Sequence, residues 1–337
     1  MDFSNNKKRL FKVGFVLAGV VAVAWLASLK NAIGVENRGL WNRITAPAPT
    51  PDDNYIMPRK ESDRLDVLIL GARGMDDPDA QDSGPLLTDS IEILSYDKKT
   101  GSASLVSVPR DLEVIISDKK TDKVNVVYEY GYYHSSDPLT FVKNKFSQIT
   151  GVYIDKVVVL NFSSFQEIID SLGGIDITLA KPFTEAQQWG YEFHLPAGPN
   201  HLSGQDALYY ARSRYSSSDF DRSQRQQQII FAIKDKLLAL DLLNEPVKTF
   251  NIFNMIRKDI STDIGVFDIN QFLELASAVD FSKINRFVIT NNNLLYDAKN
   301  SAGLYILLPY GGNFDGIKQF FQNILYGGPL PTPVPSK

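Results

Sequence analysis

The sequence contains no cysteine and, in 337 residues, only three histidines, His134, His194 and His201. Without cysteine the chain forms no disulfide, holds no cysteine-ligated zinc and performs no thiol catalysis. The histidines lie too far apart in the sequence for the His-x-x-x-His spacing of a helical metal site. These absences remove several large classes of metalloenzyme and nucleophilic enzyme.

Three common active-site motifs are also missing. The chain has no G-x-x-x-x-G-K-[ST] and no G-x-G-x-x-G, so the standard nucleotide-binding loops are absent. It has no G-x-S-x-G, which argues against a serine hydrolase with a nucleophile elbow. A glycosidase with two catalytic carboxylates stays open, because 39 Asp and Glu residues provide too many pairs to select one.

The chain has no excess of positive charge. Its 35 Lys and Arg residues against 39 Asp and Glu give a net charge of −4, which argues against a nucleic-acid partner. Recognition of a polyanion therefore has to be local. The hydrophobic content of 44% is enough to bury a full core, so the chain as a whole is not disordered.

A long uncharged run lies near the N-terminus. Val13–Leu29 has no charged residue and is long enough to cross a bilayer, which takes roughly 17–25 apolar residues. Basic residues precede it: Lys7, Lys8, Arg9 and Lys12. The positive-inside rule therefore predicts a single-pass protein of the cell membrane with a cytoplasmic N-terminus and an extracytoplasmic remainder. A signal peptide cleaved near Ala22–Ala24 is the alternative.

The remaining sequence divides by composition. Proline-rich and charged stretches follow the predicted anchor and end the chain, and the sequence between them reads as one globular domain. We expect a cytoplasmic tail (1–12), a transmembrane anchor (13–29), an extracytoplasmic linker (30–63), a catalytic domain (64–328) and a proline-rich tail (329–337).

Strand and helix patterns alternate within the domain. Asp66–Gly71 is a continuous apolar run that predicts a buried strand, and two further strands flank a turn at Asp97–Gly101. After a strand at about 156–160 we expect a helix capped at Ser163 or Ser164. Apolar residues at helical spacing predict a helix over Arg222–Leu240. Further elements are expected near 270–278 (helix), 286–290 (strand), 304–308 (strand) and 314–325 (helix). The predicted fold class is α/β, with mixed α+β possible, built on a central mixed sheet flanked by helices.

One stretch, "YARSRYSSSDFDRSQRQQQ" (Tyr210–Gln228), holds four arginines, at 212, 214, 222 and 225. Arg212 and Arg214 would share one face of an extended segment, and Arg222 and Gln226 would share one face of a helix near its start. Arginine forks and helix N-termini both suit phosphate groups. Two hypotheses stay open: a diphosphate site, or a solvated helix surface with ion pairs to its own aspartates at 219 and 221.

Other charged residues adjoin predicted strands. Asp89 begins one strand, and Arg110 and Asp111 directly follow another after Pro109. The ends of central strands are where open sheets place ligands. Lys123 and Asn125 precede a tyrosine-rich stretch that we expect to be a turn.

In order and spacing, several blocks resemble the LytR-CpsA-Psr proteins of bacterial envelopes. The likeness covers about residues 64 to 325. It is carried by "DVLILG", "TDSIEIL", "SVPRDL", "KVNVVYEYG", "VVLNFSSFQEIIDSLGGIDI", "GPNHLSGQDALYYARSR", "DFDRSQRQQQII" and "LYILLP". Family members transfer a glycopolymer from a polyprenyl-diphosphate carrier to peptidoglycan outside the membrane and form a phosphodiester. The resemblance implies the same activity, substrate, acceptor and membrane location here.

Residue by residue, the resemblance implies a catalytic set and a substrate-binding set. The catalytic set is Asp89, Arg110, Asp111, Arg212, Arg214 and Arg222. The diphosphate would be lined by Arg110, Arg212, Arg214, Arg222 and Gln226, with Lys123 and Asn125 beside it. Asp219, Asp111 and Arg225 would orient these groups, and Asp111 or Asp89 could accept a proton.

The resemblance also implies a cation, Mg²⁺ or Mn²⁺, held by Asp89. In one block this chain departs from many family members, because "LGARGMDD" has Arg73 where an Asp is often found and Leu87 precedes Thr88 in place of an arginine. A second metal ligand would then come from Asp76, Asp77 or Asp82. Hydrolysis of the same diphosphate and non-catalytic binding of polyprenyl lipid by an envelope regulator are the alternative functions.

Overall fold

The computed structural model of the chain describes residues 57–75, 77, 84–117, 120–216, 218–239, 260–264 and 284–326. The predicted anchor, most of the linker, the proline-rich tail and the helix expected near 270–278 lie outside these residues. Among the helices of the described ranges, none is both long and apolar enough to cross a membrane. Backbone contacts divide the chain into two compact units, which are described in turn.

The first of these, here called the sheet unit, comprises Lys30–Val159 and Asp280–Lys337. Five of its strands form a sheet in the order β6-β1-β2-β3-β12. Their bounds are β1 Arg64–Ala72, β2 Thr88–Asp97, β3 Ala103–Ser107, β6 Lys156–Leu160 and β12 Asn285–Val288. β1 and β3 both pair antiparallel with β2, whereas β12 pairs parallel with β3, so the predicted mixed sheet is confirmed. The apolar run in β1 is buried along most of its length, as a central strand requires.

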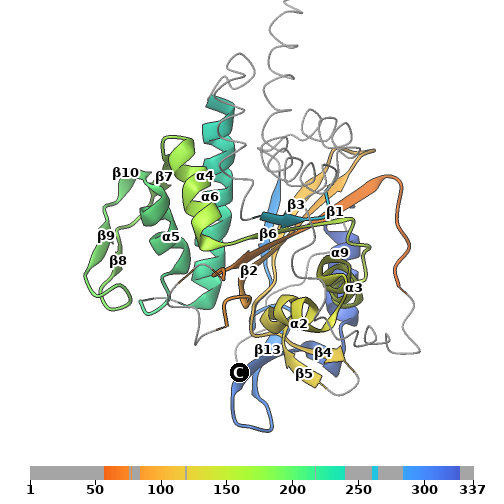
Figure 1. Ribbon diagram of the computed structural model, residues 1–337. Helices are drawn as coiled ribbons and strands as arrows, with labels where there is room; N and C mark the ends of the chain where they lie inside the picture. Colours follow the sequence, from red (N-terminus) through yellow and green to blue (C-terminus); the bar gives the residue numbers. More distant parts are fainter. Residues whose placement is uncertain are drawn as a thin grey trace, which may run out of the picture. The chain divides into compact units, whose positions relative to one another are not determined.

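Helices and two hairpins complete the sheet unit. The hairpins are β4–β5 (Glu113–Ser117 and Lys120–Lys123) and β13–β14 (Leu295–Lys299 and Tyr305–Pro309). The helices are η3 Val124–Val126, α2 Val127–His134, α3 Pro138–Thr150, η6 Tyr310–Gly312 and α9 Asp315–Asn323. In Figure 1, α3 and α9 lie side by side. The tyrosine-rich stretch is helix α2, so the turn expected there was wrong.

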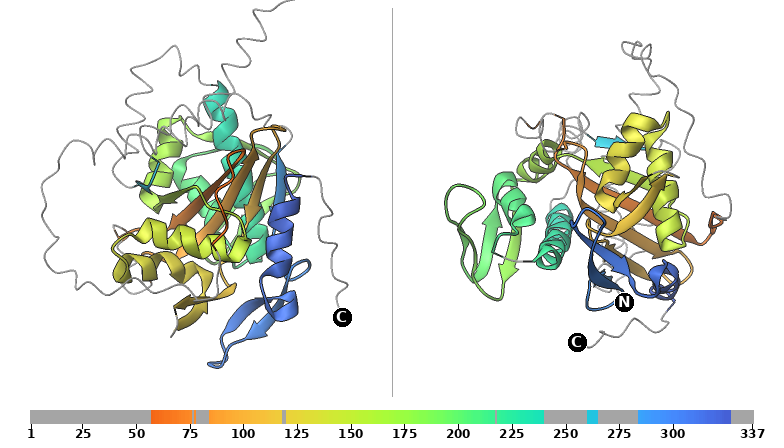
Figure 2. Two further views of the ribbon diagram at one scale, coloured as in Figure 1. Left: turned by 90° about the vertical axis from the view of Figure 1, so that its right-hand side faces the viewer. Right: turned by 90° about the horizontal axis from the view of Figure 1, so that it is seen from below.

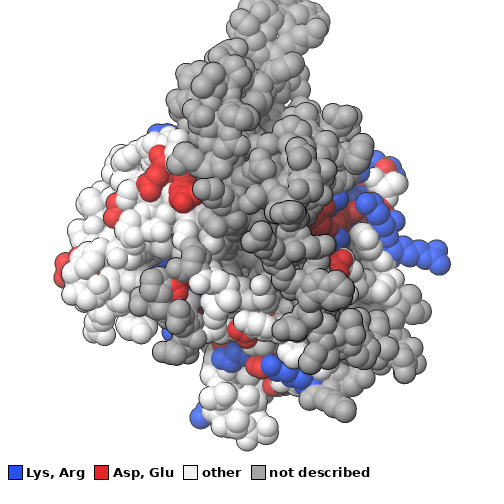
Figure 3. Space-filling model, viewed as in Figure 1, with Lys and Arg blue, Asp and Glu red and all other residues white. Residues whose placement is uncertain are grey.

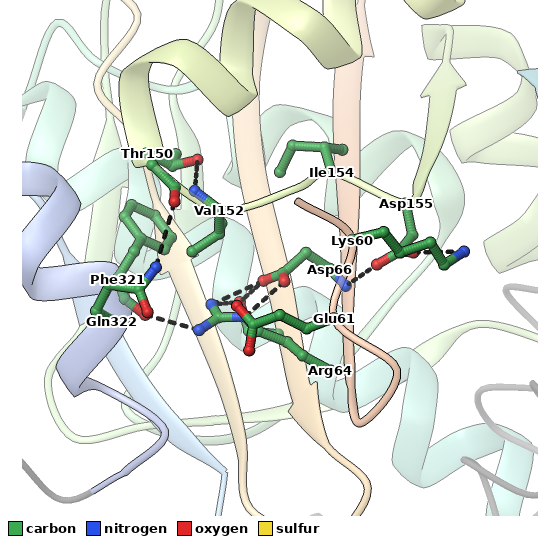
Figure 4. Close-up of polar contacts among 12 residues, drawn as sticks. Lys60, Glu61, Arg64, Asp66, Thr150, Val152, Ile154, Asp155, Phe321 and Gln322 are labelled. Atoms are coloured by element: carbon green, nitrogen blue, oxygen red, sulfur yellow. Dashed lines mark hydrogen bonds and ion pairs between the residues drawn. The ribbon is translucent and has the colours of Figure 1, made fainter. Parts of the chain in front are cut away.

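A buried ion pair fixes the start of β1. The guanidinium of Arg64 donates from Nε and Nη2 to both carboxylate oxygens of Asp66, at 2.6 and 3.0 Å. It also donates from Nη1 to the Phe321 carbonyl of α9 at 3.0 Å, and Figure 4 shows this strand-to-helix contact. The backbone N–H of Asp66 donates to the carboxylate of Asp155, which also pairs with Lys60. The network therefore ties the incoming chain, β1 and α9 together at this end of the sheet.

The second compact unit is here called the helical unit, and all its described residues lie within Leu160–Val279. Its helices are α4 Phe162–Ser171, α5 Gly204–Arg212 and α6 Asp219–Ala239. Its strands are β7 Ile175–Leu179, β8 Phe183–Glu185, β9 Phe193–Leu195, β10 Gly198–Leu202 and β11 Ile260–Thr262. Figures 1 and 2 show the three helices packed together, with the β7–β10 and β8–β9 pairs beside them.

The helical unit has its own apolar core, to which α4, β7, β10, α5 and α6 all contribute side chains. The predicted helix over Arg222–Leu240 is confirmed as α6, which begins at Asp219. The cap of α4 differs from the prediction. Asn161 is the N-cap residue and accepts from the backbone of Ser164, whose hydroxyl accepts from the Asn161 N–H in return.

Arg64→Met should destabilise the protein by about 3–5 kcal/mol, because it leaves the Asp66 carboxylate buried without its counter-charge. Denaturant unfolding monitored by circular dichroism measures the loss. Lys60→Met is the matched control: the Lys60 side chain is 57% exposed, so its pair with Asp155 should contribute at most about 1 kcal/mol. Adding Asp66→Asn to Arg64→Met should recover most of the stability. Equal losses in the two single variants would contradict this account.

Candidate active site

The predicted site residues fall into two groups, one in each unit. The strand-end cluster, in the sheet unit, consists of Asp89, Arg110, Asp111, Lys123 and Asn125. The arginine cluster, in the helical unit, consists of Arg212, Arg214, Arg222, Arg225 and Gln226. Each cluster is built by its own unit and is described by itself.

Asp89 lies at a β-bulge. Gly71 of β1 pairs with Ser90 of β2, but the next residue, Ala72, pairs with Thr88, so Asp89 is the extra residue on β2. A bulge interrupts the alternation of the strand and re-aims the side chain that it carries. A glycine suits the facing position, since a Cβ on Gly71 would come within 3.0 Å of the Ser90 Cβ. The sequence analysis placed Asp89 at the start of this strand, which is confirmed, but it did not foresee the bulge.

Charged side chains follow one another across the strand-end cluster. Asp89 Oδ1 accepts from Arg110 Nη1 at 2.6 Å, and Arg110 Nε lies 3.6 Å from an oxygen of Asp111. The other oxygen of Asp111 accepts from Lys123 Nζ at 2.5 Å. The backbone of Asp111 is held as well, because its carbonyl accepts from the N–H of Leu307 in β14 at 2.9 Å. Two carboxylates and two cations thus alternate at the ends of β2, β3 and β5.

Asn125 holds the backbone of this cluster in place. Its N–H donates to the Arg110 carbonyl at 3.3 Å, and its own carbonyl accepts from the Thr88 hydroxyl at 3.3 Å. The Asn125 side chain is buried, and its Oδ1 has no hydrogen-bond partner among the described residues. A buried acceptor of this kind is costly unless a ligand or water satisfies it. Asn125 therefore joins the two strand ends and offers one amide oxygen.

The oxygen donors of this cluster suit a hard cation only in part. The described residues contain no group of three or more Asp, Glu or His side chains that could hold a metal. Asp77 pairs with Arg73 at 3.0 Å, while Asp76 and Asp82 lie outside the described residues. However, Mg²⁺ in phosphate-handling sites commonly takes one or two carboxylates and completes its shell with water and phosphate oxygens. Asp89, with the Asn125 amide oxygen, fits that minimal set.

In the helical unit, Arg212 ends α5 and Arg214 follows it in an irregular segment. Ser213 has φ −56° and ψ 130°, so the chain leaves the helix immediately; because Arg212 is itself helical, the two arginines do not share one extended segment. The Arg212 guanidinium carbon lies 4.1 Å from the Phe162 ring centroid and 5.1 Å from that of Trp189. Stacking on aromatic faces orients a guanidinium and leaves its N–H groups directed within its own plane.

Arg222 and Arg225 are buried, which contradicts the hypothesis of a solvated helix surface. Arg225 Nε donates to the Tyr210 carbonyl at 2.9 Å, and Nη2 donates to the Ser213 carbonyl. Burial lowers the pKa of Arg225, and the nearby Tyr210 and Asp221 partly offset this effect. Gln226, one residue further along α6, donates to the Ala211 carbonyl at 3.3 Å. These side chains therefore hold the end of α5 against α6.

Arg214 differs from the other arginines. It is half-buried, and its side chain makes no hydrogen bond or ion pair with any described residue. Asp221 does not neutralise it, because the Asp221 carboxylate accepts from the N–H and hydroxyl of Ser218 at the start of α6. These Ser218 hydrogen bonds lower the pKa of Asp221. The side chain of Asp219 lies outside the described residues. Arg214 is thus a positive charge available to an anion.

Two residues that the sequence analysis missed contact the same segment. Glu185 is fully buried at the end of β8 and accepts from the N–H and hydroxyl of Ser216 at 3.0 and 3.1 Å. Burial alone would raise the pKa of Glu185, but hydrogen bonds from Ser216, Gln187 and Gln188 hold it below its usual range. Gln188 contacts Arg212 and Arg214 directly. No motif in the surrounding "TEAQQWGY" marks either residue.

The surface charge agrees with a local site. On the face that Figure 3 shows, the Lys and Arg atoms and the Asp and Glu atoms of the described residues lie in small adjoining groups. A chain of net charge −4 can concentrate arginines at one place without a broad basic surface.

Comparisons with known proteins identify the family. A model of the LytR_cpsA_psr family matches residues 42–308. Polyisoprenyl-teichoic acid–peptidoglycan teichoic acid transferase TagU of Bacillus cereus (strain AH820) is 31% identical over 77% of this chain and 80% of its own length. The TagV transferase of Bacillus subtilis is 27% identical over 71% of this chain, which spans only 60% of TagV. The crystal structure of B. subtilis TagV has the same fold, with a TM-score of 0.60, 23% identity, and coverage of 80% of this chain and 100% of that one. The chain therefore belongs to the LytR-CpsA-Psr family.

Proposed function

We propose that this protein transfers a glycopolymer from a polyprenyl-diphosphate carrier to peptidoglycan, as a membrane-anchored enzyme of the extracytoplasmic face. Membership of the family and the names of the TagU and TagV relatives support a teichoic acid or a similar anionic glycan as the group transferred. The uncharged run Val13–Leu29 with its basic N-terminal flank supports the location. Anchoring would confine enzyme and lipid carrier to the same surface.

The observation that carries the proposal is the arginine cluster, and within it Arg214. A half-buried guanidinium that has no carboxylate partner among the described residues, close in sequence to the stacked Arg212, suits the negative charge and paired oxygens of a diphosphate. Arg222 and Gln226 follow on the first turns of α6. Helix N-termini add further attraction for anions through the macrodipole and unpaired N–H groups.

The proposed reaction exchanges one phosphate ester for another. A hydroxyl oxygen of the acceptor glycan attacks the phosphorus that bears the donor glycan, and the bond from that phosphorus to the bridging diphosphate oxygen breaks. Polyprenyl phosphate leaves, a phosphodiester forms, and the hydroxyl proton passes to a carboxylate base. Phosphoryl transfer depends mainly on positioning and charge neutralisation, which arginines supply.

A divalent cation is the second part of the proposal. Asp89, with the Asn125 amide oxygen, would hold Mg²⁺ or Mn²⁺, and the cation would supply positive charge for a phosphate oxygen bound at the strand-end cluster. Arg110 and Lys123 already balance the carboxylates of Asp89 and Asp111, so the cluster presents both signs of charge to a phosphate. Asp77, which pairs with Arg73 as Asp89 pairs with Arg110, stays a candidate for the second carboxylate ligand.

Arg214→Gln should lower turnover of a diphosphate-linked donor by about 100-fold or more, because the charge that faces the transferring phosphoryl group is lost. Release of polyprenyl phosphate by the purified full-length protein in detergent measures the rate. Lys181→Gln removes one positive charge from an exposed position of the same unit and should change the rate less than twofold. Equal rates in the two variants would show that the arginine cluster does not bind the diphosphate.

The same assay, supplied with peptidoglycan, distinguishes the alternatives. Transfer should attach the glycan phosphate to the peptidoglycan fraction, where it is measured as covalently bound phosphate. Free glycan phosphate in the presence of acceptor would instead indicate a hydrolase. Binding of the donor without turnover, at any divalent cation, would indicate a lipid-binding regulator.

Removing divalent cations with EDTA should abolish turnover, and added Mg²⁺ or Mn²⁺ should restore it. Asp89→Asn should raise the Mg²⁺ concentration needed for half-maximal rate by about tenfold or more, because a neutral amide is a poorer ligand for a hard cation. Asp122→Asn is the control, since Asp122 lies on β5, pairs with exposed Lys120 and accepts from the Lys123 N–H. An unchanged Mg²⁺ requirement in Asp89→Asn would remove Asp89 from the metal site.

A further inference from the structure

Of the two half-buried arginines, Arg212 is the last residue of α5 and Arg214 follows it on an irregular backbone before α6. α5 ends at Arg212, and α6 begins at Asp219. Peptide groups in such a segment cannot be satisfied by helix or sheet hydrogen bonds and need other partners. Without those partners the direction of the Arg212 and Arg214 side chains would vary, and binding an anion would cost the entropy of ordering them.

A single side chain, Gln188, contacts the backbone on both sides of Ser213. Its Nε2 donates to the Arg212 carbonyl at 3.1 Å, and its Oε1 accepts from the Arg214 N–H at 2.8 Å. A primary amide can do this because its nitrogen donates and its oxygen accepts from separate atoms. Gln188 thus connects the backbone of both arginines to the segment that joins β8 and β9.

Two residues beside Gln188 reinforce the same contact. Trp189 donates from Nε1 to the Ser213 hydroxyl at 3.1 Å, and its ring stacks on Tyr209 of α5 with centroids 4.4 Å apart. At the end of β8, Glu185 accepts from Ser216. Figure 1 shows the β8–β9 hairpin alongside α5. The β8–β9 hairpin therefore holds the segment Arg212–Ser216 from one side. The hairpin residues that make these contacts, Glu185, Gln188 and Trp189, are not basic.

We infer that Gln188 is a positioning residue for the anion site: its amide fixes the backbone at Arg212 and Arg214 so that both guanidinium groups are pre-set to receive a diphosphate. This inference rests on the proposed function for the identity of the anion. Pre-organisation acts on affinity because the segment is ordered before the ligand arrives. In this role Gln188 does not touch the diphosphate, and it acts on binding by holding the backbone of Arg212 and Arg214.

The chain contains a probe for this site. Its three tryptophans are Trp25, Trp41 and Trp189, and Trp189 lies beside Arg212. In the full-length protein with Trp25→Phe and Trp41→Phe, purified in detergent, emission reports on Trp189 alone. Inorganic pyrophosphate is the ligand to titrate, because it presents the diphosphate without lipid or glycan. The dissociation constant is read from the change in emission, and the melting temperature is measured in parallel.

Gln188→Met removes both hydrogen bonds with little change in volume and should weaken pyrophosphate binding by about tenfold or more. Its melting temperature should stay close to that of the parent, because the apolar core of the unit is unchanged. Gln187→Met is the matched control: the Gln187 side chain is exposed, and binding should change less than twofold. Gln188→Glu keeps an acceptor for the Arg214 N–H but no donor for the Arg212 carbonyl, and it should also bind more weakly than the parent.

The outcomes separate this inference from the proposed function. In one outcome Arg214→Gln binds pyrophosphate more weakly, but both Gln188 variants bind it as the parent does. That result would overturn the positioning role of Gln188 and leave the anion site intact. Parent protein that does not bind pyrophosphate would overturn both. A lower melting temperature with an unchanged dissociation constant in Gln188→Met would show a purely structural role and also overturn the inference.

Discussion

The hydrogen bonds from the buried Arg225 guanidinium to the carbonyls of Tyr210 and Ser213 are the contact on which the arginine cluster depends. They join the second turn of α6 to the last turn of α5, and the same guanidinium lies over the rings of Phe183 and Tyr210. A buried charge of this kind is tolerated only when its donors are used. Arg225 therefore organises the segment that carries Arg212 and Arg214.

Arginines in this protein serve two purposes that burial distinguishes. Arg64 and Arg225 are buried. Arg64 donates to the carboxylate of Asp66, and Arg225 donates to backbone carbonyls. Arg212 and Arg214 are half-buried, the first stacked between aromatic rings and the second without a partner among the described residues. A guanidinium on a fixed backbone can bind phosphate at little entropic cost. This division explains how an acidic chain presents a concentrated positive site.

Sequence patterns predicted the elements whose stability is local and missed those that depend on distant contacts. β1 and α6 follow directly from apolar runs and helical spacing. Helix α2 was missed because aromatic residues have weak helix propensity, and it forms where Gly131 allows Phe141 of α3 to approach closely. The site arginines could be named from their spacing and from a family resemblance. The bulge at Asp89 and the role of Gln188 could not, because both depend on pairing with residues elsewhere in the fold.

The position of β1 has a mechanical consequence. The linker enters the sheet unit at Arg64, which faces Asp97, whereas Ala72 at the other end of the strand faces Thr88 beside Asp89. Nine residues of strand, about 30 Å at the usual rise, separate the two ends. If the proposed N-terminal anchor pulls at Arg64 while the other end of the strand is held, the force acts along β1 in shear and loads its hydrogen bonds with β2 together. The strand-end cluster would keep its geometry while the envelope moves around it.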